Sequence, residues 1–183
     1  MTTHKQYPVG DHLIDVFDDA IDFLTLHSIN DDLVPDLSLS LGWADGRDKG
    51  ENLYALYDHE QVEQLGLTNT IDKIPRVQEG LTGYKFIKAA LNVVTPISVH
   101  HMHVHAGLKV VLLYLNMEWK DGWHGETLFY DENGKDIVFA SPYVAGRVVM
   151  FDGNISHAIR PQSIDGPKFR YTMSLFFEKA QSE

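Results

Sequence analysis

The stretch Ser98–Leu115, with the sequence SVHHMHVHAGLKVVLLYL, decides the fold, because it places a dense group of histidines directly before an aliphatic segment. From Lys109 onward the segment is short, apolar and rich in valine and leucine, as in a buried β-strand. The sequence after Gly83 continues in this way without intervening helical patterns, which favours an antiparallel β-sandwich or barrel. The expected strands are Tyr84–Val94, Ser98–His105, Lys109–Leu115, Thr127–Tyr130, Ile137–Ala140, Arg147–Phe151, Ala158–Pro161 and Arg170–Phe177.

The N-terminal part has a different pattern. From Asp11 to about Ser28, apolar residues recur at spacings of three and four, which predicts an amphipathic helix capped by Asp11. Alternating leucines over 37–41 predict a short strand, and Tyr54–Leu67 is interpreted as a second helix. We therefore expect a single domain over residues 1–183, in which a helical layer (1–80) packs on a β core (81–183) that carries the functional site.

Composition excludes several classes of function. The chain has 183 residues, no cysteine, ten histidines and a formal net charge of −11. Without thiols there is no disulfide framework, cysteine nucleophile or thiolate metal site, so any metal must bind to nitrogen and oxygen. The negative charge opposes binding to a phosphate backbone, so no nucleic-acid partner is expected. The polar N-terminus and the lack of a long apolar run predict a cytoplasmic protein without a membrane anchor.

The histidine group is a candidate metal site. His100, His101, His103 and His105 fall within six positions, and side chains two apart on a strand share a face. Two of these imidazoles would form a pair of ligands, and His157 is the candidate third ligand because it follows the strand Arg147–Phe151 after a turn. Imidazole nitrogen suits iron, zinc, copper or nickel, and three protein ligands leave positions open for substrate. His100 is the expected bystander.

The C-terminal half resembles the 2-oxoglutarate- and Fe(II)-dependent oxygenases, in particular their prolyl-hydroxylase-like branch. The resemblance covers roughly 92–178 and depends on the order and spacing of several short motifs rather than on any single one. The motifs are His103-Val104-His105, Leu113-Tyr114-Leu115-Asn116, Trp123-His124-Gly125-Glu126-Thr127-Leu128-Phe129, Gly146-Arg147-Val148-Val149-Met150-Phe151-Asp152-Gly153, His157 and Arg170-Tyr171-Thr172.

The resemblance implies a mainly β fold with N-terminal helices, namely the double-stranded β-helix or cupin-like jelly roll. It also implies that His103 and His157 bind Fe(II), and that Arg170 pairs with the far carboxylate of 2-oxoglutarate. Guanidinium suits that task because it is always charged and binds carboxylate in a bidentate manner. Thr172 and Tyr114 are the other residues expected to contact this cosubstrate.

One position departs from the family. Its usual motif is His-x-Asp, which gives two histidines and one carboxylate, whereas here His105 stands in place of the aspartate. Our preferred interpretation is that His105 itself binds the metal and forms a three-histidine site. Alternatively the ligand pair shifts to the segment 101–103, or His105 becomes the first ligand and Ala106–Gly107 leaves a vacancy, as in related halogenases. A carboxylate from Glu126 or Asp152 is a further alternative.

The implied function is that of a dioxygenase that uses Fe(II), 2-oxoglutarate and O2, and that converts 2-oxoglutarate to succinate while it hydroxylates a substrate. The substrate class stays open between a small molecule, a sugar and a protein side chain. Two other functions are compatible with the histidines. One is a three-histidine enzyme without 2-oxoglutarate, either a zinc hydratase or hydrolase or an iron thiol dioxygenase. The other is a cupin-like binding module without catalysis.

Overall fold

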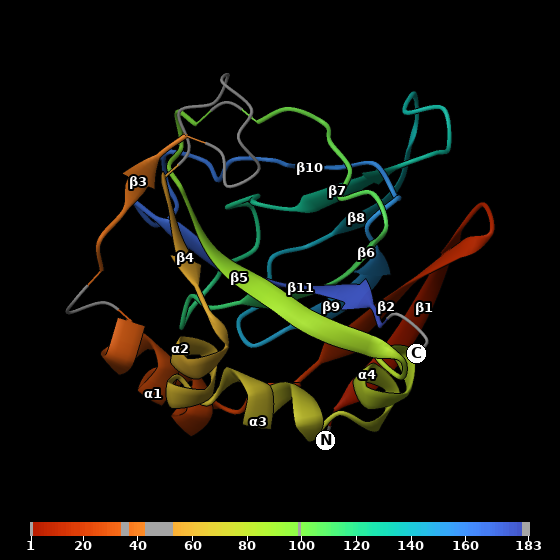
Figure 1. Cartoon of the computed structure of the whole chain (residues 1–183). Coiled ribbons are helices and arrows are strands. Elements are labelled where there is room, and N and C mark those ends of the chain that lie inside the picture. Colours follow the sequence, from red (N-terminus) through yellow and green to blue (C-terminus); the bar gives the residue numbers. More distant parts are fainter. Residues whose placement is uncertain (1, 34–36, 43–52, 99, 181–183) are drawn as a thin grey trace.

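The computed structural model describes residues 2–33, 37–42, 53–98 and 100–180. In this part of the chain, antiparallel strands form a large sheet, in the order β1-β2-β9-β6-β11-β5-β4-β3, and a small sheet, in the order β10-β7-β8 (Figure 1). The strands are β1 (Thr3–Val9), β2 (His12–Asp18), β3 (Ser40–Leu41), β4 (Leu53–Tyr57), β5 (Tyr84–Val94), β6 (Leu108–Tyr114), β7 (Thr127–Tyr130), β8 (Ile137–Ser141), β9 (Val148–Asp152), β10 (His157–Ile159) and β11 (Arg170–Lys179).

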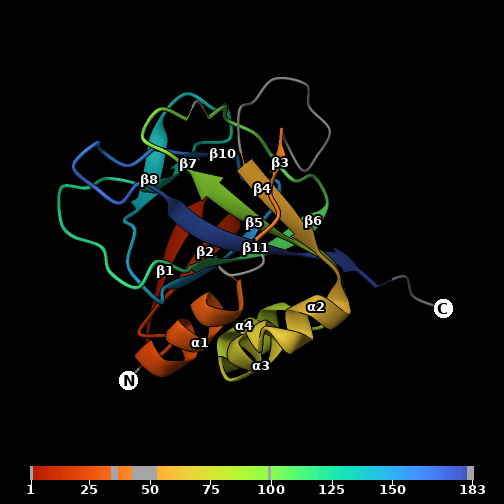
Figure 2. The same ribbon diagram turned by 90° about the vertical axis from the view of Figure 1, so that its left-hand side faces the viewer.

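Helices cover the outer face of the large sheet, and Figure 2 shows them together in one layer. Asp58 precedes α2 (His59–Gln64) and caps it with a capping box, in which its side chain accepts a hydrogen bond from the Gln61 backbone and the Gln61 side chain accepts one from the Asp58 backbone. Pro75 begins α4, at a position where its missing N–H is not needed. The helices are α1 (Phe23–Leu33), α2 (His59–Gln64), α3 (Leu67–Asp72) and α4 (Pro75–Gly80).

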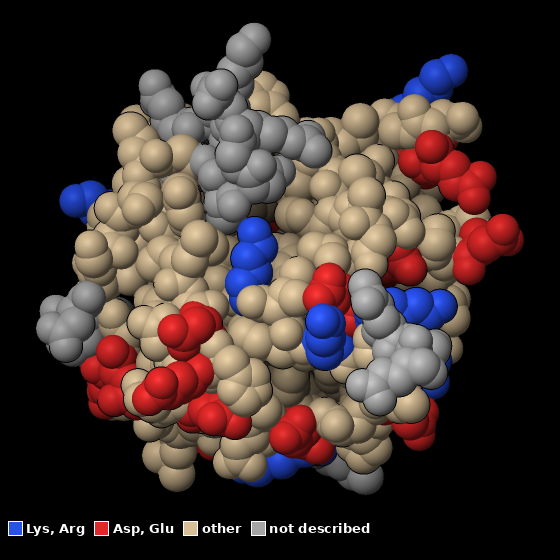
Figure 3. Space-filling view, in the orientation of Figure 1, with Lys and Arg blue, Asp and Glu red and all other residues tan. Residues whose placement is uncertain are grey.

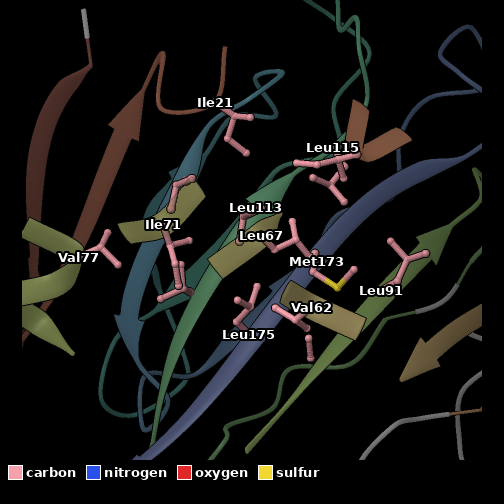
Figure 4. Packing of buried hydrophobic residues seen from close by; sticks show 14 of the residues in the cluster. Ile21, Val62, Leu67, Ile71, Val77, Leu91, Leu113, Leu115, Met173 and Leu175 are labelled. Atoms are coloured by element: carbon pink, nitrogen blue, oxygen red, sulfur yellow. The ribbon is translucent and has the colours of Figure 1, made fainter. Parts of the chain in front are cut away.

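The large sheet separates two apolar clusters, because alternate residues of a strand point to opposite faces. On β6, Val111 and Leu113 face the helices, whereas Val110 and Leu112 face the small sheet. Figure 4 shows the helix-side cluster, where Leu113, Met173, Leu175 and Leu91 from the strands meet Val62, Leu67, Ile71 and Val77 from the helices.

The helix expected from Asp11 to about Ser28 is wrong in its first part: β1 and β2 form a hairpin that joins the large sheet through β9, and helical structure begins only at Phe23, in α1. The error has a physical cause. Because both faces of the large sheet are covered, β2 buries Ile14 and Val16 on one face and Phe17 on the other. A strand that is buried on both faces loses its alternation, and its apolar residues then match helical spacings.

The second expected helix, Tyr54–Leu67, is also wrong in its first part. Residues 53–57 form β4, which pairs with β5, and helical structure begins only at His59. Of the short strand expected over residues 37–41, only Ser40–Leu41 forms a strand, β3. In the described part of residues 1–80, helices are therefore combined with the strands β1 to β4 of the large sheet.

The strands expected after Gly83 are largely confirmed. Those over Tyr84–Val94 and Thr127–Tyr130 have the expected bounds, and five others differ by one or two residues at their ends. The exception is Ser98–His105, which forms no strand in its described residues and pairs only through an isolated bridge between His103 and His157. Among the described residues, no helix is long and apolar enough to cross a membrane.

Candidate metal centre

His103, His105 and His157 come together between the two sheets. One potential ligand atom from each residue lies within 4.8 Å of those of the other two. The ring centroids of His103 and His157 are 4.4 Å apart, and that of His105 is 4.9 Å from His103 and 5.1 Å from His157. The structure therefore brings His105, which stands in place of the aspartate, into one group with His103 and His157.

Backbone hydrogen bonds fix this convergence without a regular strand. His103 and His157 exchange two bonds, N to O and O to N, each of 3.0 Å, and the amide of His105 donates to the carbonyl of Gly153 at 2.7 Å. Gly153 is required there by space, because a Cβ at this position would lie 2.3 Å from the His105 carbonyl oxygen. The segment 103–105 is thus held between β10 and the turn that precedes it.

Backbone carbonyls orient two of the three imidazole rings. Nδ1 of His157 lies 2.8 Å from the Ile155 carbonyl, and Nδ1 of His103 lies 3.0 Å from the His101 carbonyl. A carbonyl only accepts hydrogen bonds, so each Nδ1 carries the proton and each Nε2 keeps its lone pair for a metal. Burial, and then the nearby His103 and His105, hold the pKa of His157 well below its usual value.

The alternative ligands lie outside this group. His101 is exposed and does not belong to the cluster. A carboxylate of Asp152 is 3.7 Å from His12, and Glu126 lies 3.6 Å from Arg160 and 3.8 Å from His124. Among the described residues, the histidine cluster includes no carboxylate that would replace the missing aspartate.

A cavity of about 270 Å³ extends from the three histidines between the sheets. Arg170 and Thr172 line it from β11, and Thr127 lines it from β7. Arg170 is completely buried. Thr127 and Thr172 are also buried, with exposed fractions of 2% and 1%. The cavity therefore joins the candidate metal ligands to a buried positive charge.

The guanidinium of Arg170 is held in place by neutral groups. It donates from Nε to the Gly125 carbonyl at 2.8 Å, and from its two terminal nitrogens to the hydroxyls of Thr172 and Thr127, both at 3.3 Å. The central guanidinium carbon, Cζ, lies 5.0 Å from the centre of the Tyr143 ring.

No carboxylate of the described chain forms an ion pair with Arg170. Burial lowers its pKa, and the electrostatic effects of Tyr114, Tyr143 and Glu126 offset only part of this. A buried cation without an anionic partner is costly, so this arrangement is suited to receive an anion.

Tyr114 lies behind this site rather than in it. Its hydroxyl donates to the Thr127 hydroxyl at 2.8 Å, and Tyr114 is not among the described residues that line the cavity. Thr127, which sequence reasoning missed, thus connects Tyr114 to Arg170. Gly125 and Thr127 belong to the motif 123–129, but the sequence assigned neither of them a role, because both act through contacts with a residue 43 or more positions away.

His100 lies near Arg170 and outside the ligand group, as expected for a bystander. Burial, and then the charge of Arg170, lower its pKa to about 3. Since its pKa in the unfolded chain is about 6.5, the unfolded state binds the proton first as the pH falls. The folded apoprotein should therefore lose stability below about pH 6.5, and this contribution reaches about 2 kcal/mol at pH 5.

This pH dependence can be measured by urea unfolding of the metal-free protein at pH 7 and pH 5. The variant His100→Gln cannot gain this proton, so its loss of stability between the two pH values should be smaller than that of the wild type by about 1–2 kcal/mol. Equal losses in the two proteins would contradict the assigned environment of His100.

Comparison with known proteins supports the fold. No model of a protein family matches the chain, and no curated protein sequence matches it either. Among solved structures, a prolyl-4-hydroxylase from Pseudomonas putida has a TM-score of 0.68 at 13% identity, over 92% of this chain and 93% of the other. HygX from Streptomyces hygroscopicus, solved with nickel and 2-oxoglutarate, has a TM-score of 0.68 at 8% identity, over 90% and 82%.

A third similar structure is an oxidoreductase of the 2OG-Fe(II) oxygenase family from Burkholderia pseudomallei, with a TM-score of 0.65 at 15% identity, over 92% of this chain and 86% of the other. These alignments span 90–92% of the chain. The chain thus has the double-stranded β-helix fold of the 2-oxoglutarate oxygenases, as its sequence motifs led us to expect.

Proposed function

We propose that this protein is an Fe(II)- and 2-oxoglutarate-dependent oxygenase in which His103, His105 and His157 bind the metal and Arg170 anchors the cosubstrate. One observation carries the proposal: a convergent group of three imidazoles and a fully buried guanidinium, without a carboxylate partner in the described chain, share one cavity. A cluster of histidines alone would fit several metals and reactions. The buried cation is what favours a dicarboxylate cosubstrate.

The donor set fits Fe(II). Nitrogen ligands of intermediate softness suit iron, and three protein ligands leave positions open for a chelating cosubstrate and for O2. Nε2 of His103 and His157 face away from their carbonyl partners, which set the tautomer of each ring. With three neutral ligands the site is one unit more positive than the usual set of two histidines and one carboxylate, which favours anions at the open positions.

The far end of the cavity fits a carboxylate. Arg170 offers a planar group with several N–H donors, and the Thr172 hydroxyl lies beside it at 3.3 Å. Tyr114 orients Thr127, whose hydroxyl also contacts Arg170, so we infer that Tyr114 positions the anchor through Thr127. Apolar residues on the walls, such as Val110, Leu112 and Ile159, limit water in the cavity.

When bound, Fe(II) and 2-oxoglutarate would supply the activation of O2 that couples decarboxylation of the keto acid to hydroxylation of a substrate. The protein's own residues have simpler tasks. The histidines hold the metal at the mouth of the anion site, Arg170 sets the direction of the cosubstrate, and the buried walls keep solvent away. As for the substrate, a small molecule, a sugar and a protein side chain are all compatible with this assignment.

The proposal predicts formation of succinate. Protein purified without an affinity tag, loaded with Fe(II) under argon and then exposed to air with 2-oxoglutarate, should release succinate even without a prime substrate, although slowly. Omission of iron, 2-oxoglutarate or air should each abolish this release. Succinate measured by mass spectrometry provides the readout, and metal content measured by plasma mass spectrometry provides the control for loading.

Other outcomes would assign the remaining functions. Bound zinc with hydrolysis of model esters, and no succinate, would indicate a zinc enzyme. O2 uptake with a thiol substrate, without any need for 2-oxoglutarate, would indicate a thiol dioxygenase. Metal binding with no turnover in any of these assays would indicate a binding module. Each of these results would overturn the proposed function.

A further inference from the structure

Asn116, the last residue of the motif 113–116, is buried but is not among the described residues that line the cavity. Its side chain reaches the beginning of β11. Nδ2 of Asn116 donates to the Phe169 carbonyl at 2.9 Å, and Oδ1 accepts from the Tyr171 amide at 2.8 Å. Phe169 and Tyr171 are the two residues that flank Arg170. One side chain therefore holds the backbone on both sides of the proposed cosubstrate anchor.

These hydrogen bonds take the place of strand pairing next to Arg170. On this side, β11 pairs with β6 only as far as Tyr114, and the same register would pair Leu115 with Tyr171. Of the two hydrogen bonds that such a pair exchanges, the described chain forms one, from the Leu115 amide to the Tyr171 carbonyl at 3.1 Å. The Tyr171 amide bonds instead to Oδ1 of Asn116. A side chain thus fixes the edge of β11 at the position of Arg170.

Tyr143 connects Asn116 to the guanidinium group itself. Its hydroxyl accepts a hydrogen bond from the Asn116 amide at 2.9 Å, and shares its proton between Asn116 Oδ1 at 2.7 Å and the Tyr171 carbonyl. Burial raises the pKa of Tyr143, so the hydroxyl keeps this proton and remains a donor. The ring lies 5.0 Å from Cζ of Arg170 and stacks on Trp119 at a centroid distance of 4.0 Å. Asn116 and the anchor therefore share one buried aromatic neighbour.

Arg170 depends on such supports because water does not surround it. Figure 3 shows basic and acidic side chains at the surface of one face of the molecule, in contact with solvent. Arg170 is completely buried, and its bonds to the hydroxyls of Thr172 and Thr127, both 3.3 Å, are longer than is usual for an N–H donor and an oxygen acceptor. The place of the guanidinium is therefore set largely by the backbone that carries it. A displacement of about 1 Å is enough to lower activity about 100-fold.

We propose that Asn116 is a positioning residue, which holds Arg170 where it meets the far carboxylate of the cosubstrate and so sets the preference of the site for dicarboxylates. The inference rests on the proposed function, because it takes Arg170 as the anchor of 2-oxoglutarate. Asn116 acts through the backbone of residues 169–171 and through Tyr143, and not by contact with the ligand. A 2-oxo acid without a far carboxylate makes no use of Arg170, so its binding should not depend on Asn116.

Titration calorimetry of the Mn²⁺-loaded protein measures this preference without turnover. The two ligands are 2-oxoglutarate and 2-oxopentanoate, which has the same carbon chain and the same 2-oxo acid end but a methyl group in place of the far carboxylate. The ratio of their dissociation constants, determined directly or by competition, reports the contribution of the anchor. In the wild type, 2-oxoglutarate should bind at least about 100-fold more tightly than 2-oxopentanoate, as expected for a bidentate charged contact.

The variant Asn116→Ala should lower this ratio at least about tenfold, because 2-oxoglutarate binds more weakly while the affinity for 2-oxopentanoate changes less than about twofold. The matched control is Asn30→Ala. Nδ2 of Asn30 donates to the Leu115 carbonyl at 2.9 Å, but Asn30 forms no hydrogen bond with residues 169–171 of the described chain. Both variants remove an amide that bonds to backbone carbonyls, so both should lose thermal stability, whereas Asn30→Ala should leave the ratio unchanged.

A second variant, Tyr143→Phe, tests the same inference with a smaller change. It removes only the hydroxyl that bonds to Asn116 and keeps the ring between Arg170 and Trp119. The ratio should fall by about fivefold, as expected for the loss of one buried hydrogen bond. This variant decides the question if Asn116→Ala does not fold.

The results separate the inference from the proposed function. A wild-type ratio close to one would overturn the proposed function, and with it the role of Asn116. A high wild-type ratio that persists in Asn116→Ala, or in Tyr143→Phe if Asn116→Ala does not fold, would overturn the inference and leave the proposed function standing. An equal fall of the ratio in Asn30→Ala would also overturn the inference, because loss of stability alone would then explain the effect.

Discussion

Replacement of Arg170 by alanine should raise the KM for 2-oxoglutarate by at least about 100-fold, because a buried, bidentate charged contact contributes roughly 3 kcal/mol or more to binding. The metal should stay bound, since Arg170 is anchored to Gly125, Thr127 and Thr172 and to none of the three histidines. Succinate formation at varied 2-oxoglutarate, together with metal content, measures both effects. An unchanged KM would contradict the assigned role.

Because Arg170 is completely buried, its removal also leaves the Gly125 carbonyl without this donor. The variant Arg170→Gln keeps a neutral donor of similar shape and serves as the control for folding. It should show the same loss of 2-oxoglutarate binding as Arg170→Ala with a smaller loss of thermal stability. Arg170→Lys should be intermediate in KM, because it keeps the charge but not the bidentate geometry. Equal values of KM for Arg170→Gln and the wild type would show that the charge is not needed.

Replacement of His157 by alanine should weaken metal binding at least about 100-fold, because it removes a direct ligand, and loss of outer partners alone typically costs 10–100-fold. His157 is the most buried of the three histidines, so solvent does not easily replace it. Calorimetric titration with Mn²⁺ or Co²⁺, followed by metal analysis after dialysis, measures the loss. Succinate formation should disappear in the same variant.

The matched control is His101→Ala, which removes a neighbouring imidazole outside the cluster and should leave metal affinity close to that of the wild type. The variant His105→Asp restores the usual motif and keeps three ligands, so it should retain the metal. If His101→Ala loses the metal while His105→Ala keeps it, the ligand pair lies at 101–103 and the assignment is wrong.

The sequence predicts the secondary structure well in some parts of the chain and poorly in others, for a physical reason. Tyr84–Val94 and Thr127–Tyr130 were predicted with their bounds, because β-branched and aromatic residues between turn signals indicate strands directly. The hairpin of β1 and β2 was missed, because burial on both faces removed the alternation of β2. The spacing of apolar residues depends on whether one or both faces of a segment are buried. Which other elements bury those faces is decided by tertiary packing.

The candidate site shows the same division. The sequence supplied His103, His105, His157, Arg170 and Thr172, and the structure brings the histidines into one cluster and all five to one cavity. The sequence assigned no role to Thr127, which depends on contacts across the two sheets, and did not show that Tyr114 lies behind that residue.

By itself, the sequence limited any metal site to nitrogen and oxygen ligands, because the chain has no cysteine, and it singled out the histidines before a buried strand as candidate ligands. It also determined the mainly β fold, since alternation and turn residues act locally. Only the tertiary structure decided that His105, rather than His101, joins His103 and His157, because backbone hydrogen bonds with residues 153 and 157 orient this segment in the absence of a regular strand. Choosing among neighbouring histidines depends on backbone contacts some fifty residues away along the chain, and no local pattern encodes those contacts.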